Sequence, residues 1–267
     1  MLSLNTIHCG DCLELVKDIE DKSIDMILCD LPYGVTQNKW DSIIPLDTLW
    51  NQYKRISKDN AAIVLTAIQP FASMLICSNP LWFKYEWIWQ KDKATGFLNA
   101  NRAPLRIHEN ILTFYSSPPV YNPQKFLGNP CHTRGKTTGQ KGKTTNYGSH
   151  IGGETIGDMK FPLSIIKFNK DTGLHPTQKP VALFEYLIKT YSNEGAIVLD
   201  NCIGSGTTAE ACINTKRMFI GIEKEPQFVK IANDRISGVI KNSELHGGII
   251  TFLPVHANQN TDRQHRQ

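Results

Sequence analysis

Two short stretches of the sequence bring together residue types that could do chemistry. The first, Asp30-Leu31-Pro32-Tyr33, ends an apolar run that begins at Ser23. Asp30 offers a charged hydrogen-bond acceptor, Pro32 fixes the local backbone, and Tyr33 offers an aromatic ring with a polar hydroxyl. On its own, this stretch is also typical of a proline-containing turn whose acid caps a helix.

The second stretch, residues 196–213, has the pattern of a strand, a glycine turn and a helix. Gly204 and Gly206 allow the backbone to approach a ligand closely, and the following helix offers its N-terminus to a polar group. No Gly-Lys-Ser/Thr follows, which excludes a P-loop. The G-x-G-x-x-A spacing and Glu223 also fit a dinucleotide site. Asp200 before the loop favours a cationic ligand such as S-adenosylmethionine, because it would repel a pyrophosphate.

The elements that must position these stretches alternate along the chain. Short apolar, β-branched runs predict seven strands, at residues 5–9, 24–30, 61–67, 85–90, 110–115, 196–200 and 218–223. Helical patterns occupy residues 12–20, 46–57, 70–77, 180–191, 206–215 and 225–239. This alternation predicts an α/β protein with a doubly wound, mostly parallel seven-stranded sheet.

The middle of the chain interrupts the alternation. Residues 118–172 are rich in Gly, Thr and Lys and show no period of 2 or 3.6, which indicates a functional insertion. Between residues 120 and 180, nine lysines or arginines stand against three acids, although the whole chain carries only +4. A local basic excess is what a phosphate backbone attracts, and it is also compatible with a merely solvated loop.

Other features exclude whole classes of protein. We find no signal-peptide pattern at the N-terminus and no apolar run of about 20 residues, so no membrane association is expected. The seven cysteines favour a reduced, cytoplasmic protein. Cys9 and Cys12 form a C-x-x-C without a second pair nearby, so we expect no metal site.

Three motifs in order, "CDLPYG", "HPTQKP" and "VLDNCIGSGTT", resemble the amino-group DNA methyltransferases that use S-adenosylmethionine. Their order is similar to the β-type permutation of that family, in which the catalytic motif precedes the cofactor loop. The resemblance spans about residues 6–240. It implies a Rossmann-like methyltransferase fold with an inserted target-recognition segment. The resemblance divides the chain into four parts. Residues 1–118 form the catalytic half and residues 173–253 the cofactor-binding half of the methyltransferase domain, residues 119–172 form the basic insertion, and residues 254–267 form a disordered tail.

The resemblance also pairs residues 87–92 with residues 108–115 as strands that flank the target-base pocket, and it assigns roles by position. The catalytic residues it implies are Asp30, Leu31, Pro32 and Tyr33. The cofactor-binding residues it implies are Asp11, His175, Lys179, Asp200, Cys202, Gly204, Ser205, Gly206, Thr207 and Glu223. Within the basic insertion, the DNA-binding candidates are Arg134, Lys136, Lys141 and Lys143.

Two departures from the family pattern stand out. Leu31 replaces the first proline of the usual D-P-P-Y, which should be harmless if the residue contributes only its carbonyl. Asn201 and Cys202 replace Pro-Phe, so another ring has to pack against the cofactor.

The chemistry of such enzymes explains the catalytic motif. The lone pair of an adenine amine is delocalised, and acceptors for both N–H bonds favour a nitrogen that can attack the sulfonium methyl. Asp30 and the Leu31 carbonyl would be those acceptors. The base must first be extruded from the duplex, at a cost of a few kcal/mol.

The resemblance implies S-adenosylmethionine as cofactor and double-stranded DNA as partner, in a protein encoded by a bacterium or phage. It leaves a homodimer and a cognate restriction endonuclease open. Asp rather than Ser at the head of the motif favours adenine N6 over cytosine N4. An NAD-dependent oxidoreductase and a non-catalytic DNA-binding protein remain alternatives from other classes.

Overall fold

The computed structural model describes residues 2–35, 41–131, 141–144, 148–151, 157–171 and 178–245. The chain divides into two compact units. The larger comprises Met1–Tyr121 with Ile165–Gln267, and the smaller comprises Asn122–Ser164. The candidate site is built within the larger unit.

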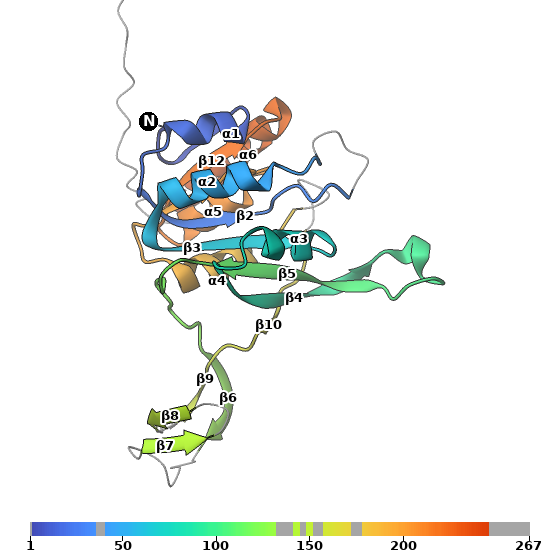
Figure 1. The fold of residues 1–267 in the computed structure, drawn as a ribbon. Helices are drawn as coiled ribbons and strands as arrows, with labels where there is room; N and C mark the ends of the chain where they lie inside the picture. The colour runs from blue at the N-terminus through green and yellow to red at the C-terminus, as the bar shows by residue number, and fades with distance from the viewer. Residues whose placement is uncertain are drawn as a thin grey trace, which may run out of the picture. The chain divides into compact units, whose positions relative to one another are not determined.

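The larger unit contains an eight-stranded sheet in the order β1-β12-β11-β2-β3-β5-β4-β10 (Figure 1). The first five strands in this order, β1, β12, β11, β2 and β3, run parallel to one another. Strand β5 is antiparallel to both β3 and β4, and β10 is parallel to β4. Their bounds are β1 Thr6–Cys9, β2 Ile24–Cys29, β3 Ser57–Ala67, β4 Phe83–Thr95, β5 Arg106–Phe114, β10 Ile165–Lys167, β11 Ile197–Asp200 and β12 Met218–Glu223.

The predicted fold class is therefore confirmed, with one strand more than expected. The seven predicted strands correspond to β1–β5, β11 and β12. The eighth, β10, lies in the stretch that we expected to be an insertion. It is only three residues long, which is too short to show the two-residue period that identifies a strand in sequence.

Helices cover both faces of this sheet. Their bounds are α1 Cys12–Leu15, α2 Leu46–Ile56, α3 Phe71–Ser78, α4 Val181–Tyr191, α5 Thr207–Asn214 and α6 Pro226–Leu245. The first predicted helix is shorter than expected, since a 3₁₀ turn at Val16–Asp18 follows α1 directly. Among the described helices, we find none with the length and apolar character needed to cross a membrane.

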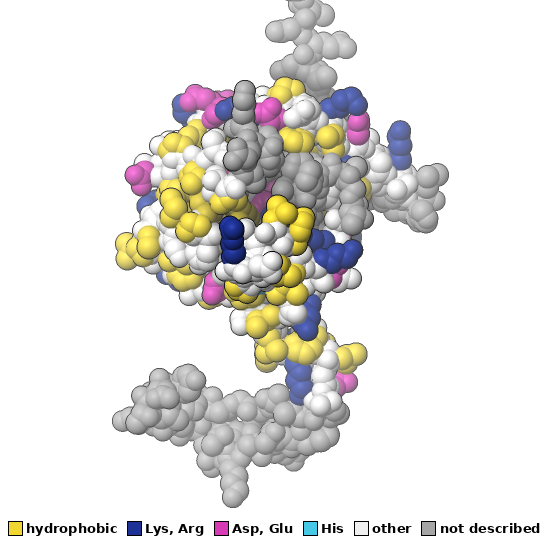
Figure 2. All heavy atoms as spheres, turned by 90° about the vertical axis from the view of Figure 1, so that its right-hand side faces the viewer, with side chains coloured by type: hydrophobic (Ala, Val, Ile, Leu, Met, Phe, Trp, Pro, Cys, Tyr) yellow, Lys and Arg dark blue, Asp and Glu magenta, His cyan; other side chains and the backbone are white. Residues whose placement is uncertain are grey.

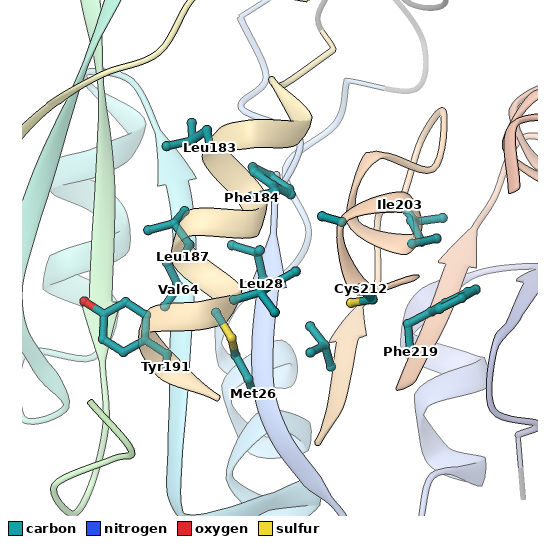
Figure 3. Packing of buried hydrophobic residues seen from close by; sticks show 14 of the residues in the cluster. Met26, Leu28, Val64, Leu183, Phe184, Leu187, Tyr191, Ile203, Cys212 and Phe219 are labelled. Carbon is teal, nitrogen blue, oxygen red and sulfur yellow. The ribbon is translucent and has the colours of Figure 1, made fainter. Parts of the chain in front are cut away.

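The central strand β2 is buried on both of its faces, which explains why its sequence is apolar except at the half-buried Asp25 near its start. Met26 and Leu28 pack with residues of α4 and α5, including Phe184 and Cys212 (Figure 3). Ile27 belongs to the second core cluster, on the other face, together with Trp50 and Tyr53 of α2 and Phe71 of α3. Burial of each large apolar side chain stabilises the folded state by about 1.5–3 kcal/mol. This packing on both faces holds β2, and therefore its carboxyl end, in a fixed place.

The described part of the smaller unit contains two short antiparallel strand pairs. Strand β6 (Phe126–Cys131) pairs with β9 (Gly157–Lys160), and β7 (Lys141–Thr144) pairs with β8 (Gly148–Ile151). Of the four predicted DNA-binding residues, Arg134 and Lys136 lie outside the described residues. Lys141 and Lys143 lie on β7, where only the backbone is described. Their roles stay predictions.

Candidate functional site

The two sequence motifs meet at one edge of the sheet. Strand β2 lies beside β11 in parallel, with Met26 opposite Val198 and Ile27 opposite Leu199. Asp30 follows β2 and Asp200 ends β11, so both acids reach the carboxyl edge, where open α/β sheets bind ligands. A cavity of about 600 Å³ opens there. Figure 2 looks onto this edge, where a small acidic area is visible near the centre of the face with apolar side chains nearby.

Most of the predicted site residues line this one cavity. They are Asp11, Asp30, Leu31, Pro32, Tyr33, Lys179, Asp200, Cys202, Gly204, Ser205, Thr207 and Glu223. Gly206 does not line it and instead forms the N-cap of α5. His175 lies outside the described residues. The structure thus brings twelve of these fourteen predicted residues together, while the role of each residue stays a prediction.

The carboxylate of Asp30 is held on both of its oxygens. The Tyr33 hydroxyl donates to Oδ1 at 2.5 Å, and the Thr66 hydroxyl donates to the same oxygen. The Lys179 ammonium lies 2.6 Å from Oδ2. The ring of Tyr33 packs against Phe71, with 5.4 Å between centroids. The Tyr33 hydroxyl therefore orients Asp30, a contact that the sequence motif did not predict.

Lys179 was predicted to bind the cofactor, and in the structure it belongs to a chain of buried charges. Its ammonium lies 3.4 Å from Oε2 of Glu109, and Lys91 pairs with Oε1 of Glu109. Burial alone would lower the pKa of Lys179, but the charge of Asp30 and other neighbours raises it well above its usual value. Burial would likewise raise the pKa of Glu109, and the two lysines lower it instead. Both groups are therefore charged.

Asp200 forms hydrogen bonds with the glycine loop and the helix that follows it. Its carboxylate accepts the Cys202 N–H at 3.0 Å and the hydroxyl of Thr208. Because the side chain is buried, the pKa of Asp200 rises from 3.8 to about 7, and the nearby charge of Asp30 adds to the effect. A carboxylate that titrates near neutral pH responds strongly to a cation bound beside it.

Glu223, at the end of β12, also forms a hydrogen bond with the glycine loop. Its two oxygens accept the N–H groups of Gly204 and Glu225, each at 2.9 Å. Gly204 and Gly206 have φ values of +54° and +85°, a left-handed region that favours glycine. Gly204 lines the cavity, and a Cβ atom there would meet nothing within 4 Å.

The residues that depart from the family pattern have other contacts. Asn201 also lines the cavity, and its side-chain oxygen accepts a 2.5 Å hydrogen bond from the buried Tyr53 hydroxyl. Cys202 lines the cavity without offering a ring, but Phe184 of α4 and Phe228 of α6 line it too. These rings can supply the aromatic packing that the sequence motif lacks.

Asp11 stands at the start of α1, where its carboxylate caps the helix by accepting the Leu13 N–H at 2.9 Å. It lines the cavity next to the glycine loop. Lys224 lies 3.9 Å from its second oxygen. An exposed, half-satisfied carboxylate at this position can accept a further hydrogen bond from a ligand.

The sequence analysis missed three polar residues at this site, although it expected the strands that carry two of them to flank the target-base pocket. Thr66 stood out only as a hydroxyl in a buried apolar strand, which requires a partner. Lys91 and Glu109 carried the same kind of signal, as charges in apolar strands. Both lie on the hairpin of β4 and β5, the predicted strand pair, which extends beyond the neighbouring strands in Figure 1. Its stem residues Thr95 and Arg106 line the cavity.

The tip of this hairpin is apolar and flanked by basic residues. Phe97 and Leu98 are 77% and 86% exposed. The sequence from Lys93 to His108 contains two arginines, Arg102 and Arg106, and no acid. An exposed apolar tip with cationic flanks is suited to a polyanionic partner that also offers flat apolar surface.

Comparison with known proteins places these motifs in a family context. A family model described as DNA methylase matches residues 24–234. The Type II methyltransferase M.BglII of Bacillus subtilis is 27% identical over 88% of this chain and 69% of its own length. The DNA adenine methyltransferase YhdJ of Escherichia coli K12 is 28% identical over 86% of this chain and 82% of its own.

A solved structure, the M1.HpyAVI complex with SAM, has a similar fold. The TM-score is 0.58, with 24% identity over 86% of this chain and 98% of that one. At this level of identity the likeness supports the fold alone. It agrees with the doubly wound arrangement described above.

Proposed function

Because the chain belongs to the DNA methylase family, we propose that it transfers a methyl group from S-adenosylmethionine to the N6 amino group of an adenine flipped out of double-stranded DNA. The observation that carries this proposal is the meeting of Asp30 and the glycine loop in one cavity. Methyl transfer needs the acceptor amine and the methyl donor side by side in a fixed alignment. Adjacent carboxyl ends of β2 and β11 supply that arrangement.

The residues around the glycine loop fit S-adenosylmethionine. A volume of about 600 Å³ is in the usual range for such a ligand. The open space at Gly204 allows the ligand to approach the backbone, Glu223 can accept ribose hydroxyls, and Phe184 can pack against a flat ring. Asp200 would favour the positive charge of the ligand. When bound, S-adenosylmethionine supplies an electrophilic methyl group.

The residues of the catalytic motif would prepare the amine. Asp30 accepts one N–H of the adenine amino group and the Leu31 carbonyl accepts the other. Tyr33 and Thr66 hold the carboxylate in place through Oδ1. Alignment of the amine with the sulfonium methyl group supplies most of the rate enhancement, because the attack does not need a strong acid or base. Stacking of the base on Tyr33 stays part of the proposal.

The name of YhdJ, a DNA adenine methyltransferase, and the Asp at the head of the motif both favour adenine. Cytosine N4 remains the second candidate, since its amine presents the same two N–H bonds. Family membership removes the oxidoreductase alternative. A DNA-binding protein without catalysis would not need a carboxylate oriented by three separate donors.

DNA binding is assigned to two regions. The basic insertion, with Arg134, Lys136, Lys141 and Lys143, would grip phosphates. The β4–β5 hairpin would contact the duplex beside the cavity that receives the base. A cytoplasmic location, which we also propose, would give the protein access to double-stranded DNA. A homodimer and a cognate restriction endonuclease remain open as partners.

The test is methylation of DNA by the purified protein with S-adenosylmethionine, followed by digestion to nucleosides. We expect N6-methyladenine. Asp30→Asn should abolish the product, whereas Asp59→Asn, which removes an exposed acid paired with Lys22, should not. N4-methylcytosine as the only product would replace adenine by cytosine. No methylated base from the parent protein would refute the enzyme assignment.

A further inference from the structure

The ion pair between Asp30 and Lys179 raises a difficulty for the proposed chemistry. An amino group that docks on Asp30 needs a carboxylate oxygen to accept its N–H. Oδ1 is already bonded by two hydroxyl groups, and Oδ2 is bonded by the Lys179 ammonium at 2.6 Å. The side chain of Lys179 is only 6% exposed, so water cannot readily take over its bond. The lysine needs another partner when the amine arrives.

Glu109 lies in position to be that partner. Its Oε2 is 3.4 Å from the Lys179 ammonium, and among the described residues it is a buried oxygen with no hydrogen-bond partner. Charge-assisted hydrogen bonds normally measure about 2.7–2.9 Å. A shift of well under 1 Å would therefore move the ammonium from a full bond with Asp30 to a full bond with Glu109.

Lys91 keeps Glu109 ready for this exchange. It pairs with Oε1, the other oxygen of the same carboxylate, and is itself 4% exposed. This pairing leaves Oε2 directed to Lys179. The four groups contain two carboxylates and two ammonium groups, so moving one lysine between acids changes no net charge. A shift within a neutral set avoids the penalty of exposing an unpaired buried charge.

We propose that Glu109 is a positioning residue that takes Lys179 from Asp30 when the target amino group docks. This inference rests on the proposed function. In the free protein, Lys179 holds Asp30 in its catalytic orientation. On docking, the amine donates an N–H to the oxygen that Lys179 leaves, and the ammonium closes on Glu109. No covalent bond changes in this step. It concerns the oxygen of Asp30 that receives the amine, so we expect its effect on acceptance of the target base rather than on cofactor affinity.

The key variant is Glu109→Gln, which removes the negative charge that attracts Lys179 and leaves the lysine on Asp30. We expect kcat/KM for DNA to fall at least tenfold while the Kd for S-adenosylmethionine stays within twofold of the parent. Glu109→Asp, which keeps the charge on a shorter side chain, should recover part of the loss. Glu86→Gln is the matched control, because Glu86 lies on the neighbouring strand β4 and bonds Asn110.

A second substitution in the same protein separates an exchange of partners from simple damage. In Glu109→Gln/Lys179→Met, the lysine that blocks Asp30 is gone, so kcat/KM should exceed that of Glu109→Gln alone. A merely structural role for Glu109 would make the double variant worse. If Glu109→Gln yields no folded protein, the comparison of Glu109→Asp with Glu109→Asp/Lys179→Met carries the same test.

The outcomes distinguish this inference from the proposed function. A parent protein that transfers no methyl group to DNA overturns both. An active parent with Glu109→Gln indistinguishable from Glu86→Gln overturns the inference alone. It is also overturned by a double variant no more active than the single one, or by an equal loss of cofactor affinity.

Discussion

The two glycines of the loop after β11 should respond differently to the same substitution. Gly204→Ala places a methyl group on a backbone with φ +54°, where the new Cβ meets nothing within 4 Å. The conformational strain costs about 1–2 kcal/mol, and no clash adds to it. Because Gly204 lines the cavity, the methyl group enters the space where the cofactor would approach the backbone. We expect at least a tenfold loss of S-adenosylmethionine affinity.

Gly206→Ala is the matched comparison. Its φ of +85° carries similar strain, but the new Cβ would lie 3.0 Å from Cβ and 3.2 Å from Cα of Ala232 in α6. Backbone atoms of a packed helix cannot move away cheaply, and overpacking adds about 1–3 kcal/mol. The expected loss of unfolding free energy is therefore about 2–5 kcal/mol. Gly206 does not line the cavity, so the folded fraction should bind the cofactor nearly as well as the parent.

Both variants can be measured by urea unfolding and by calorimetric titration with S-adenosylmethionine at a temperature where each is folded. The expected result is a crossed pattern, in which Gly204→Ala loses affinity and Gly206→Ala loses stability. Parental affinity in Gly204→Ala would show that the ligand does not approach this loop. Equal destabilisation of the two variants would show that backbone strain decides the cost and that the contact with Ala232 does not.

Three further perturbations test other parts of the site. Tyr33→Phe removes the hydroxyl bonded to Asp30 but keeps the ring, so kcat should fall about tenfold with an unchanged KM for DNA; a raised KM with normal kcat would favour base stacking alone. Burial raises the pKa of Asp200 to about 7, so the stability it contributes is complete below pH 3.8 and is lost as pH rises to 7. Asp200→Asn should therefore match the parent in urea unfolding at pH 4 and exceed it at pH 8 by up to about 4 kcal/mol; equal stability at both pH values would contradict the burial argument. Replacing Phe97 and Leu98 at the exposed hairpin tip by serine should weaken duplex binding about tenfold, as measured by fluorescence anisotropy, and leave the affinity for the cofactor unchanged. If duplex binding is unchanged, the hairpin does not contact DNA.

The parts of the fold that could be predicted are those encoded locally. Strand β2 is buried on both faces, so its sequence is an apolar run, and the run ends where Asp30 reaches the sheet edge. The loop after β11 carries its glycines where positive φ values occur. Pattern alone was enough to place both at the carboxyl edge of a doubly wound sheet. Strand β10 escaped because three residues contain too little of a period to recognise.

The contacts that orient Asp30 could not be predicted in the same way. Thr66 and Lys179 lie 36 and 149 positions from it along the chain. No spacing rule connects residues on different elements, and which ones meet depends on strand order and register. Lys179 in particular had a cofactor role by motif position, and only the packed structure shows the ion pair that it forms.

The two acids at the strand ends illustrate how one buried edge can hold like charges close together. Both carboxylates line a single cavity, and the charge of Asp30 contributes to the raised pKa of Asp200. Asp30 is compensated by a lysine that stays charged. Among the described residues, the partners of Asp200 are hydroxyl, thiol and N–H groups, and its pKa rises to about 7. A fixed cation beside Asp200 would pair it permanently and remove its attraction for a cationic ligand. The asymmetry therefore suits a site in which one acid is held ready for an amine and the other receives its counter-charge from the cofactor.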